Sequence, residues 1–210
     1  MCPEAAVGDT GTIDGVTYVK RDRDGVDSLL EADKNNPELS TTCTSGITDM
    51  NRLFDLNEEF DQDISSWDTS QVTNMDGTFY FASDFNQDIG NWDTSKVSSM
   101  VYMLGSTDAF NQDISSWDTS QVTNMTGMFA LAEAFDQDIS SWCVEKIDSK
   151  PYSFDAFSPI TNETSYQPDW GAPCSSEPDD STEQGGTESS SAATVGRWVV
   201  PIMLSFCAIL

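Results

Sequence analysis

Histidine is absent from this chain of 210 residues. Because histidine is the usual general base near neutral pH and the commonest transition-metal ligand, its absence disfavours both catalysis and a transition-metal site. Basic residues are also scarce: 9 Lys and Arg residues face 36 Asp and Glu residues, and the net charge is −27. Since nucleic acids are bound through clustered basic side chains, we expect no nucleic-acid partner. The simplest role of the excess negative charge is solubility and self-repulsion.

Long apolar runs are missing except at the C-terminus. Met1-Cys2-Pro3 has neither the basic start nor the apolar stretch of a signal peptide, so if the protein is exported we expect its true start to lie upstream. Residues 196–210 form an apolar tail that is short for a membrane-spanning helix, which needs about 20 residues. Small residues at 189–193 precede it, as in a lipid-anchor signal, although the polar spacer is short. A truncated transmembrane helix and an incidental tail are the alternatives.

One phrase fills much of the remaining chain, because it is stated four times. It begins at Phe60, Phe85, Phe110 and Phe135 and ends at Trp67, Trp92, Trp117 and Trp142, always 25 residues apart. Residues 68–92 and 118–142 are identical at 16 of 25 positions. A fixed period of roughly 20–50 residues predicts a repeat solenoid, a stack of supersecondary units, rather than one globular core.

Within each repeat the apolar positions predict two short elements. The run from Val72 to Ala82, with apolar residues spaced by 3, 4 and 3, predicts a short helix or helical turn, and Gln87–Gly90 predicts a short strand. No unit can bury its apolar side alone, so the Met, Phe and Trp columns are interpreted as core and not as a ligand site. Phe85 and Ile89 both look inward. Either a bend separates them, or the intervening glutamines form a buried amide ladder: Gln62, Gln87, Gln112 and Gln137.

The repeats divide the chain into five segments. A solenoid exposes its core at both ends, so the segments that flank the repeats are expected to be caps. Beyond the second cap, a stretch of Ser, Glu, Asp, Gly and Thr without apolar periodicity predicts a disordered stalk. The segments are an N-terminal cap (1–46), a four-repeat solenoid (47–142), a C-terminal cap (143–174), an acidic Ser-rich stalk (175–195) and the apolar tail (196–210).

Inside the caps the sequence predicts few elements. Residues 11–19 are expected to form a β-hairpin because Asp14-Gly15 suits a tight turn, and residues 26–32 are a helical candidate. In the C-terminal cap we expect the last open coil to be covered by Phe154, Phe157 and Ile160.

The five cysteines include no CxxC pair, so a zinc site has no support. Their placement at the two ends of the repeats predicts two disulfides that close the ends in an oxidising compartment, Cys2–Cys43 and Cys143–Cys174. Cys43 and Cys143 occupy equivalent positions four repeats apart. At about 4.8 Å per level they lie roughly 19 Å apart, which excludes a bond between them.

Two columns of aspartate are the most pointed polar feature. One column is Asp63, Asp88, Asp113 and Asp138, and the other is Asp68, Asp93 and Asp118. Like charges on neighbouring levels repel by roughly 1 kcal/mol per pair in water. Either local hydrogen bonds offset this repulsion, in which case the aspartates cap turns, or bound Ca²⁺ does, with the first column as its ligands. No other cofactor is expected.

Two asparagines fit the pattern for N-glycosylation. Asn162 precedes Glu163-Thr164 in the C-terminal cap, where a glycan has room. Asn124 precedes Met125-Thr126 inside a repeat, next to a core methionine, and is the weaker candidate.

The repeated phrase, clearest over residues 110–129, resembles the BspA-like leucine-rich-repeat surface proteins. More narrowly it is similar to the 25-residue lipoprotein-associated repeat once described as a domain of unknown function in mycoplasma surface proteins. The caps share the resemblance at Gly15–Tyr18, Cys43–Met50 and Trp170–Cys174, so that it covers about residues 2–174. It implies a leucine-rich-repeat-like solenoid, exported or attached to the cell surface and adhesive in some relatives. It implies no catalytic residues.

Two functions fit these features. The first is a non-enzymatic cell-surface or secreted module that binds an unknown protein or glycan and is attached to a membrane through its C-terminal tail. The alternative is a structural coat or matrix protein that binds Ca²⁺ through the aspartate columns. An enzyme is disfavoured, because every repeat offers the same carboxylates whereas acid–base catalysis needs two that are tuned differently.

Overall fold

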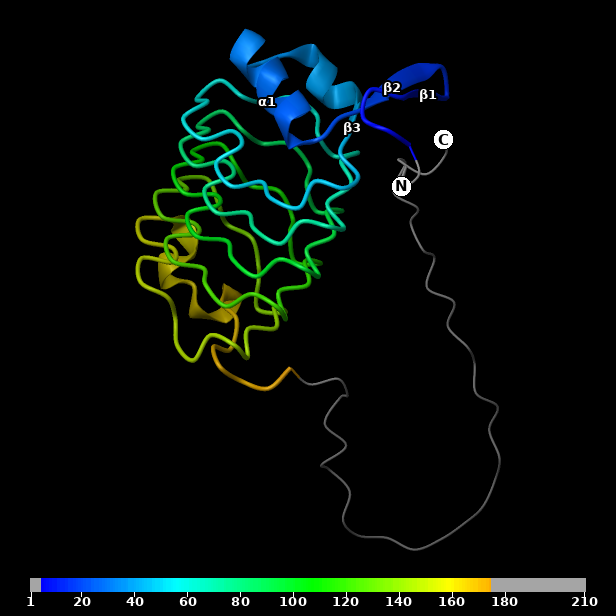
Figure 1. Ribbon diagram of the computed structural model, residues 1–210. Coiled ribbons are helices and arrows are strands. Elements are labelled where there is room, and N and C mark those ends of the chain that lie inside the picture. The colour runs from blue at the N-terminus through cyan, green and yellow to red at the C-terminus, as the bar shows by residue number, and fades with distance from the viewer. Residues whose placement is uncertain (1–4, 175–210) are drawn as a thin grey trace, which may run out of the picture.

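The computed structural model describes residues 5–174. From residue 44 onward the chain winds in successive coils that stack on one another, with the N-terminal elements at one end of the stack and short C-terminal helices at the other (Figure 1). The expected stalk and tail lie outside the described residues, and so do the first four residues.

A small three-stranded sheet and two helices precede the coils. Strands β1 and β2 form the expected hairpin, and the turn between them places Asp14 and Gly15 at φ of 49° and 83°. Strand β3 pairs with β2 in parallel. The elements are β1 (Thr10–Ile13), β2 (Val16–Lys20), α1 (Arg23–Ala32), the 3-10 helix η1 (Pro37–Thr41) and β3 (Thr42–Cys43).

Helices α1 and η1 cover the first coil. Helix α1 begins three residues before the expected start, because the Asp22 carboxylate accepts a hydrogen bond from the Gly25 amide and caps it there. Val26 of α1 and Leu39 of η1 are fully buried. The Trp67 indole donates to the Leu39 carbonyl at 2.9 Å, which joins η1 to the first repeat.

The stretch expected to be helical is a run of overlapping turns. Amides two residues apart, beginning with Met75, donate to carbonyls of the next coil, 24 residues ahead, at 2.7–3.0 Å: those of Met75, Gly77, Phe79 and Phe81. The amides of Thr78, Tyr80 and Ala82 donate back to carbonyls three residues earlier. An α-helix would use all these amides internally. The helix prediction was therefore wrong: the apolar spacing is compatible with one face of a helix, but half of the backbone amides join coils instead.

The strand expected at Gln87–Gly90 is also absent. Among the described repeats, parallel pairing is reduced to single-residue bridges through Asp49, Asn74, Ser99 and Asn124. Near the expected strand the Asn86 amide donates to the Asp61 side chain at 2.9 Å, and the Asn111 amide to the Asn86 side chain at 3.0 Å. Side-chain acceptors thus replace the backbone carbonyls that a strand ladder requires.

The glutamines lie between the two arrangements that the sequence left open. All four are half-buried. The Gln112 amide group donates to both the carbonyl and the side chain of Asn86, at 2.9 Å each, and Gln137 bonds Asn111 in the same way. An amide ladder therefore exists, but it pairs Gln with Asn of the preceding coil and is partly open to solvent.

Aromatic columns fill the interior of the stack. Equivalent rings follow one another at 5.8, 5.7 and 6.0 Å along the column of Phe60, Phe85, Phe110 and Phe135, all fully buried. Each tryptophan indole donates to a carbonyl one coil back, as Trp117 does to Ile89 at 3.0 Å. A buried threonine column does the reverse, and Thr94 donates to the Asp118 carbonyl of the next coil at 3.0 Å.

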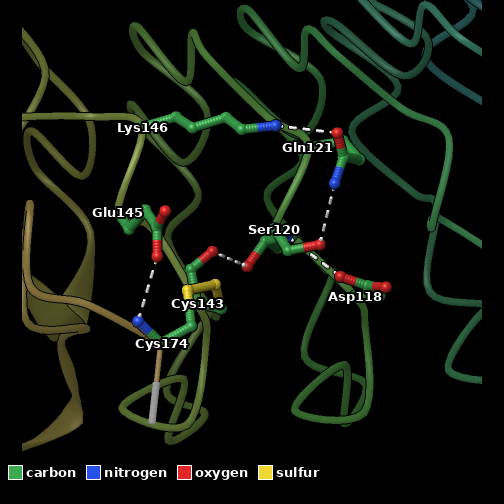
Figure 2. Close-up of a disulfide and its surroundings, with 8 residues drawn as sticks. Asp118, Ser120, Gln121, Cys143, Glu145, Lys146 and Cys174 are labelled. Atoms are coloured by element: carbon green, nitrogen blue, oxygen red, sulfur yellow. Dashed lines mark hydrogen bonds between the residues drawn. A yellow bond between two sulfur atoms is a disulfide. The ribbon is translucent and has the colours of Figure 1, made fainter. Parts of the chain in front are cut away.

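A disulfide and a buried ion pair close the C-terminal end. Cys143 is bonded to Cys174, with Cα atoms 5.3 Å apart, and the Cys174 amide also donates to Glu145 at 3.2 Å (Figure 2). The Lys150 ammonium lies 2.7 Å from the buried Asp155 carboxylate, which also accepts from Gln167. The closing 3-10 helices are η2 (Pro159–Asn162) and η3 (Thr164–Tyr166).

The covering of the last coil differs in one residue from expectation. Phe154 and Ile160 are fully buried, but Phe157 is 81% exposed. The closing segment is shifted by one residue: the Gly127 amide bonds Tyr152, 25 residues ahead rather than 24. The left-handed φ expected at position 156 from the period falls on Phe157, and its side chain points outward.

Cys43 is also held in a disulfide. Because Cys143 and Cys174 bind each other, the partner of Cys43 lies outside the described residues, and its pairing with Cys2 stays a prediction.

The tryptophan column yields a stability prediction. Trp117→Phe keeps an aromatic ring but leaves the buried Ile89 carbonyl without its indole donor, which costs about 1–2 kcal/mol. For a chain of this size we expect the melting temperature to fall by roughly 3–6 °C in a thermal melt followed by circular dichroism.

The matched control is Trp170→Phe. The Trp170 indole nitrogen is buried without a hydrogen-bond partner, so this substitution removes an N–H group that bonds nothing. We expect a clearly smaller loss, and equal losses in the two variants would contradict the role of the inter-coil indole bond.

Candidate functional site

Each aspartate of the two columns caps a local turn. In the column proposed as calcium ligands, Oδ1 accepts from the backbone amide two residues ahead at 2.9–3.0 Å, in Asp63, Asp88, Asp113 and Asp138. The second column does the same at 3.0–3.1 Å, in Asp68, Asp93 and Asp118. The contacts match the turn-capping interpretation. Within residues 5–174, no three Asp, Glu, Cys or His side chains are grouped as a metal site, and calcium binding stays a prediction.

Two of these aspartates have shifted acidities. Hydrogen bonds from the side chain and then the backbone of Ser115 lower the pKa of Asp113, and those of Ser140 lower the pKa of Asp138. These bonds favour the charged form, so both residues stay ionised well below neutral pH.

The two candidate glycosylation sites are both accessible. The Asn124 side chain is exposed, and its oxygen accepts from the amide and hydroxyl of Thr126 at 3.0 and 2.8 Å. Asn162 is exposed at the end of η2. Glycosylation at either residue stays a prediction.

An exposed apolar column runs along the stack where each run of turns ends. Its members have left-handed backbone, with φ between 56° and 65°, at Leu56, Phe81, Ser106, Leu131 and Phe157. The four apolar side chains are 58%, 37%, 46% and 81% exposed in chain order. The column is continuous, because the amides of its first four members donate at 2.8–3.0 Å to the carbonyl that precedes the next member.

Two tyrosines widen this column. The Tyr80 ring meets Phe81 edge-on at 4.5 Å and lies 5.3 Å from the Tyr102 ring, between centroids. Both tyrosines are half-buried. We call the whole surface the apolar edge: Leu56, Tyr80, Phe81, Tyr102, Leu131 and Phe157.

The backbone conformation of the apolar edge is costly for its residues. A left-handed φ costs a residue with a Cβ atom roughly 1–2 kcal/mol, which glycine avoids. A neighbouring left-handed column uses glycine in alternate coils, at Gly77 and Gly127. There the Arg52 and Tyr102 side chains lie across the glycine of the next coil, and an added Cβ at Gly127 would collide with the Tyr102 ring. Glycine is thus used where a neighbour needs the space, whereas the apolar edge keeps large side chains despite the cost.

A line of carboxylates borders the apolar edge. These residues lie two or three positions after edge positions, and all are exposed; we call them the acidic rim: Glu58, Glu59, Asp84, Asp108 and Glu133. Partial burial, followed by the nearby charges of Glu133 and Asp84, raises the pKa of Asp108. The rim therefore forms one connected negative field.

Sequence reasoning missed the apolar edge. Leu56, Phe81 and Leu131 recur at the repeat period, but they fall outside the helical face that includes Phe79 and Ala82. The signal available was an apolar residue kept in register where a helix would face solvent.

The stacked 25-residue coils place the molecule among repeat proteins, in which each unit contacts its neighbours and the units together present one long surface. The chain belongs to the family described as "Mycoplasma protein of unknown function, DUF285", which matches residues 27–142 and 89–167. No curated protein and no solved structure matches the chain. Across residues 5–174, no helix has both the length and the apolar character needed to cross a bilayer.

The acidic rim yields a pH prediction. The pKa of Asp108 is higher in the folded than in the unfolded chain, so its destabilising effect is complete at neutral pH and disappears as pH falls through both values. Asp108→Asn is therefore expected to raise the melting temperature at pH 7 by roughly 1–2 °C, as befits an exposed group, and to leave it unchanged near pH 3.

Asp169→Asn serves as the control for general charge reduction, because it removes the same charge from an exposed position in the closing segment. An equal gain from both variants at pH 7 would show that net charge, and not the acidic rim, is responsible.

Proposed function

We propose that the protein is a non-enzymatic binding or adhesion module, displayed at the cell surface or secreted, with a leucine-rich-repeat-like solenoid of the BspA-like kind. The single observation that supports it most is the apolar edge. Isolated exposed apolar side chains are common, but a continuous exposed column with a polar border is typical of an interaction surface. Its ligand is a protein or a glycan.

Two further observations support display outside the cytosol. The Cys143–Cys174 bond requires oxidising conditions to persist. Membership of the DUF285 family agrees with the resemblance to surface-protein repeats. Membrane attachment through residues 196–210 is part of the proposal, and that segment lies outside the described residues.

The alternative, a coat or matrix protein that binds Ca²⁺, is favoured by the regular spacing of exposed carboxylates on successive coils. The turn-capping bonds of Asp63, Asp88, Asp113 and Asp138 weaken it, since each carboxylate already uses one oxygen locally. An experiment can separate the two roles.

Surface display is tested on intact cells that express the native gene. A membrane-impermeant amine reagent is expected to label the chain while a cytosolic enzyme of the same cells stays unlabelled. Cys143 and Cys174 are expected to react with an alkylating reagent only after reduction. A chain that escapes labelling and whose cysteines alkylate without reduction contradicts the proposal.

The calcium alternative is tested by melting the full chain with and without chelator and by calorimetric titration with Ca²⁺. For a binding module we expect no change in melting temperature. Asp113→Asn is the informative variant, because asparagine keeps the acceptor for the Ser115 amide and removes the charge. A chelator effect that this variant abolishes would favour the coat role.

A further inference from the structure

The apolar edge has the dimensions of an extended peptide. It spans five coils, from Leu56 to Phe157, joined by backbone hydrogen bonds at every step. Four steps of about 4.8 Å give a length of about 19 Å, which an extended segment covers with about six residues. In such a segment alternate side chains point the same way, so about three of them would face the edge together.

Hollows at the two ends of the edge combine an apolar side chain with carboxylates. One is lined by Leu56, Glu58 and Glu59, together with residues 33–35 and Asn57. The other is lined by Phe157 and Glu133, together with residues of η2. Each hollow suits a side chain with an apolar stem and a cationic head, as Lys and Arg have.

The charges near the edge favour a basic partner. The acidic rim contains carboxylates only, and the cations of the repeats are engaged elsewhere. Lys96 and Lys146 donate to Gln71 and Gln121, at 2.9 and 2.7 Å, and Arg52 pairs with Asp55 at 3.4 Å. A second copy of this chain would bring a like-charged rim against this one, and repulsion disfavours it.

We propose that the apolar edge and acidic rim dock an extended segment of a partner protein in which apolar side chains alternate with Lys or Arg. This inference rests on the proposed function as a binding module and specifies its surface and its class of partner. The apolar side chains of the segment cover the edge. Its cations face the rim and reach into the two end hollows.

The test uses the full oxidised chain and fluorescence anisotropy. The probe is a labelled, end-blocked octapeptide of alternating Val and Lys. Two comparison octapeptides replace Val by Ser or Lys by Glu. We expect the Val-Lys peptide to bind at least about tenfold more tightly than either comparison, a difference of about 1.4 kcal/mol. Its affinity is also expected to fall as salt screens the rim.

The decisive variant is the double substitution Phe81→Ser and Leu131→Ser. Serine already occupies this column at Ser106 with the same left-handed backbone, so the coils are expected to keep their structure. We expect about tenfold weaker binding of the Val-Lys peptide. The control is Val16→Ser, which removes an exposed apolar side chain of strand β2 and is expected to change nothing.

A second variant, Asp108→Asn with Glu133→Gln, tests the rim. It is expected to weaken binding and to flatten the salt dependence. Equal binding of all three peptides, or unchanged binding by the Phe81 and Leu131 variant, overturns the inference.

The inference and the proposed function can fail separately. If a glycan array yields a ligand whose binding the Phe81 and Leu131 substitutions abolish, while the Val-Lys peptide does not bind, the protein remains a binding module but the partner class is wrong. If the chain proves to be a reduced protein inside the cell, the proposed surface function fails, whatever the peptide does.

Discussion

Hydrogen bonds between successive coils are the interaction on which the rest of the structure depends. In each run of turns, every second amide can be satisfied within its own coil, and the others need a carbonyl from the next coil. A buried amide without a partner costs about as much as a lost hydrogen bond, so no coil is stable without a neighbour. This requirement explains why helices α1 and η1 cover one end, and why a disulfide and the Lys150–Asp155 pair close the other.

The two sides of a coil meet this requirement differently. Along the run of turns, backbone bonds backbone, which sets a spacing of about 4.8 Å. On the phenylalanine side, Asn and Gln side chains span the gap, and equivalent rings lie 5.7–6.0 Å apart. The tight side is thus the one that ends in the apolar edge. There the backbone holds exposed side chains in a fixed order, so that a ligand would meet a surface already arranged for it.

The period of the sequence predicted which residues are buried better than it predicted their backbone. Phe, Met, Trp and Val columns were assigned to the core from their spacing, and all are buried. The helix and the strand were wrong because apolar spacing reports which way a side chain points and not where its amide donates. The aspartates were correctly seen as turn formers, since Asp-x-Ser is a local pattern. The apolar edge escaped notice because exposure there depends on a left-handed φ that Leu56 and Phe81 do not announce.

The glycines beneath Arg52 and Tyr102 bear on how such an array can change length over evolution. A large side chain in one coil lies across a glycine in the next, in the order Arg52, Gly77, Tyr102, Gly127. Deleting one coil would bring Arg52 against Tyr102, whose Cβ atom takes the space that Gly77 leaves free. Deleting two would seat Arg52 on Gly127 without a collision. The heritable unit of this protein is therefore a pair of repeats, and recombination that adds or removes a single one is expected to be selected against.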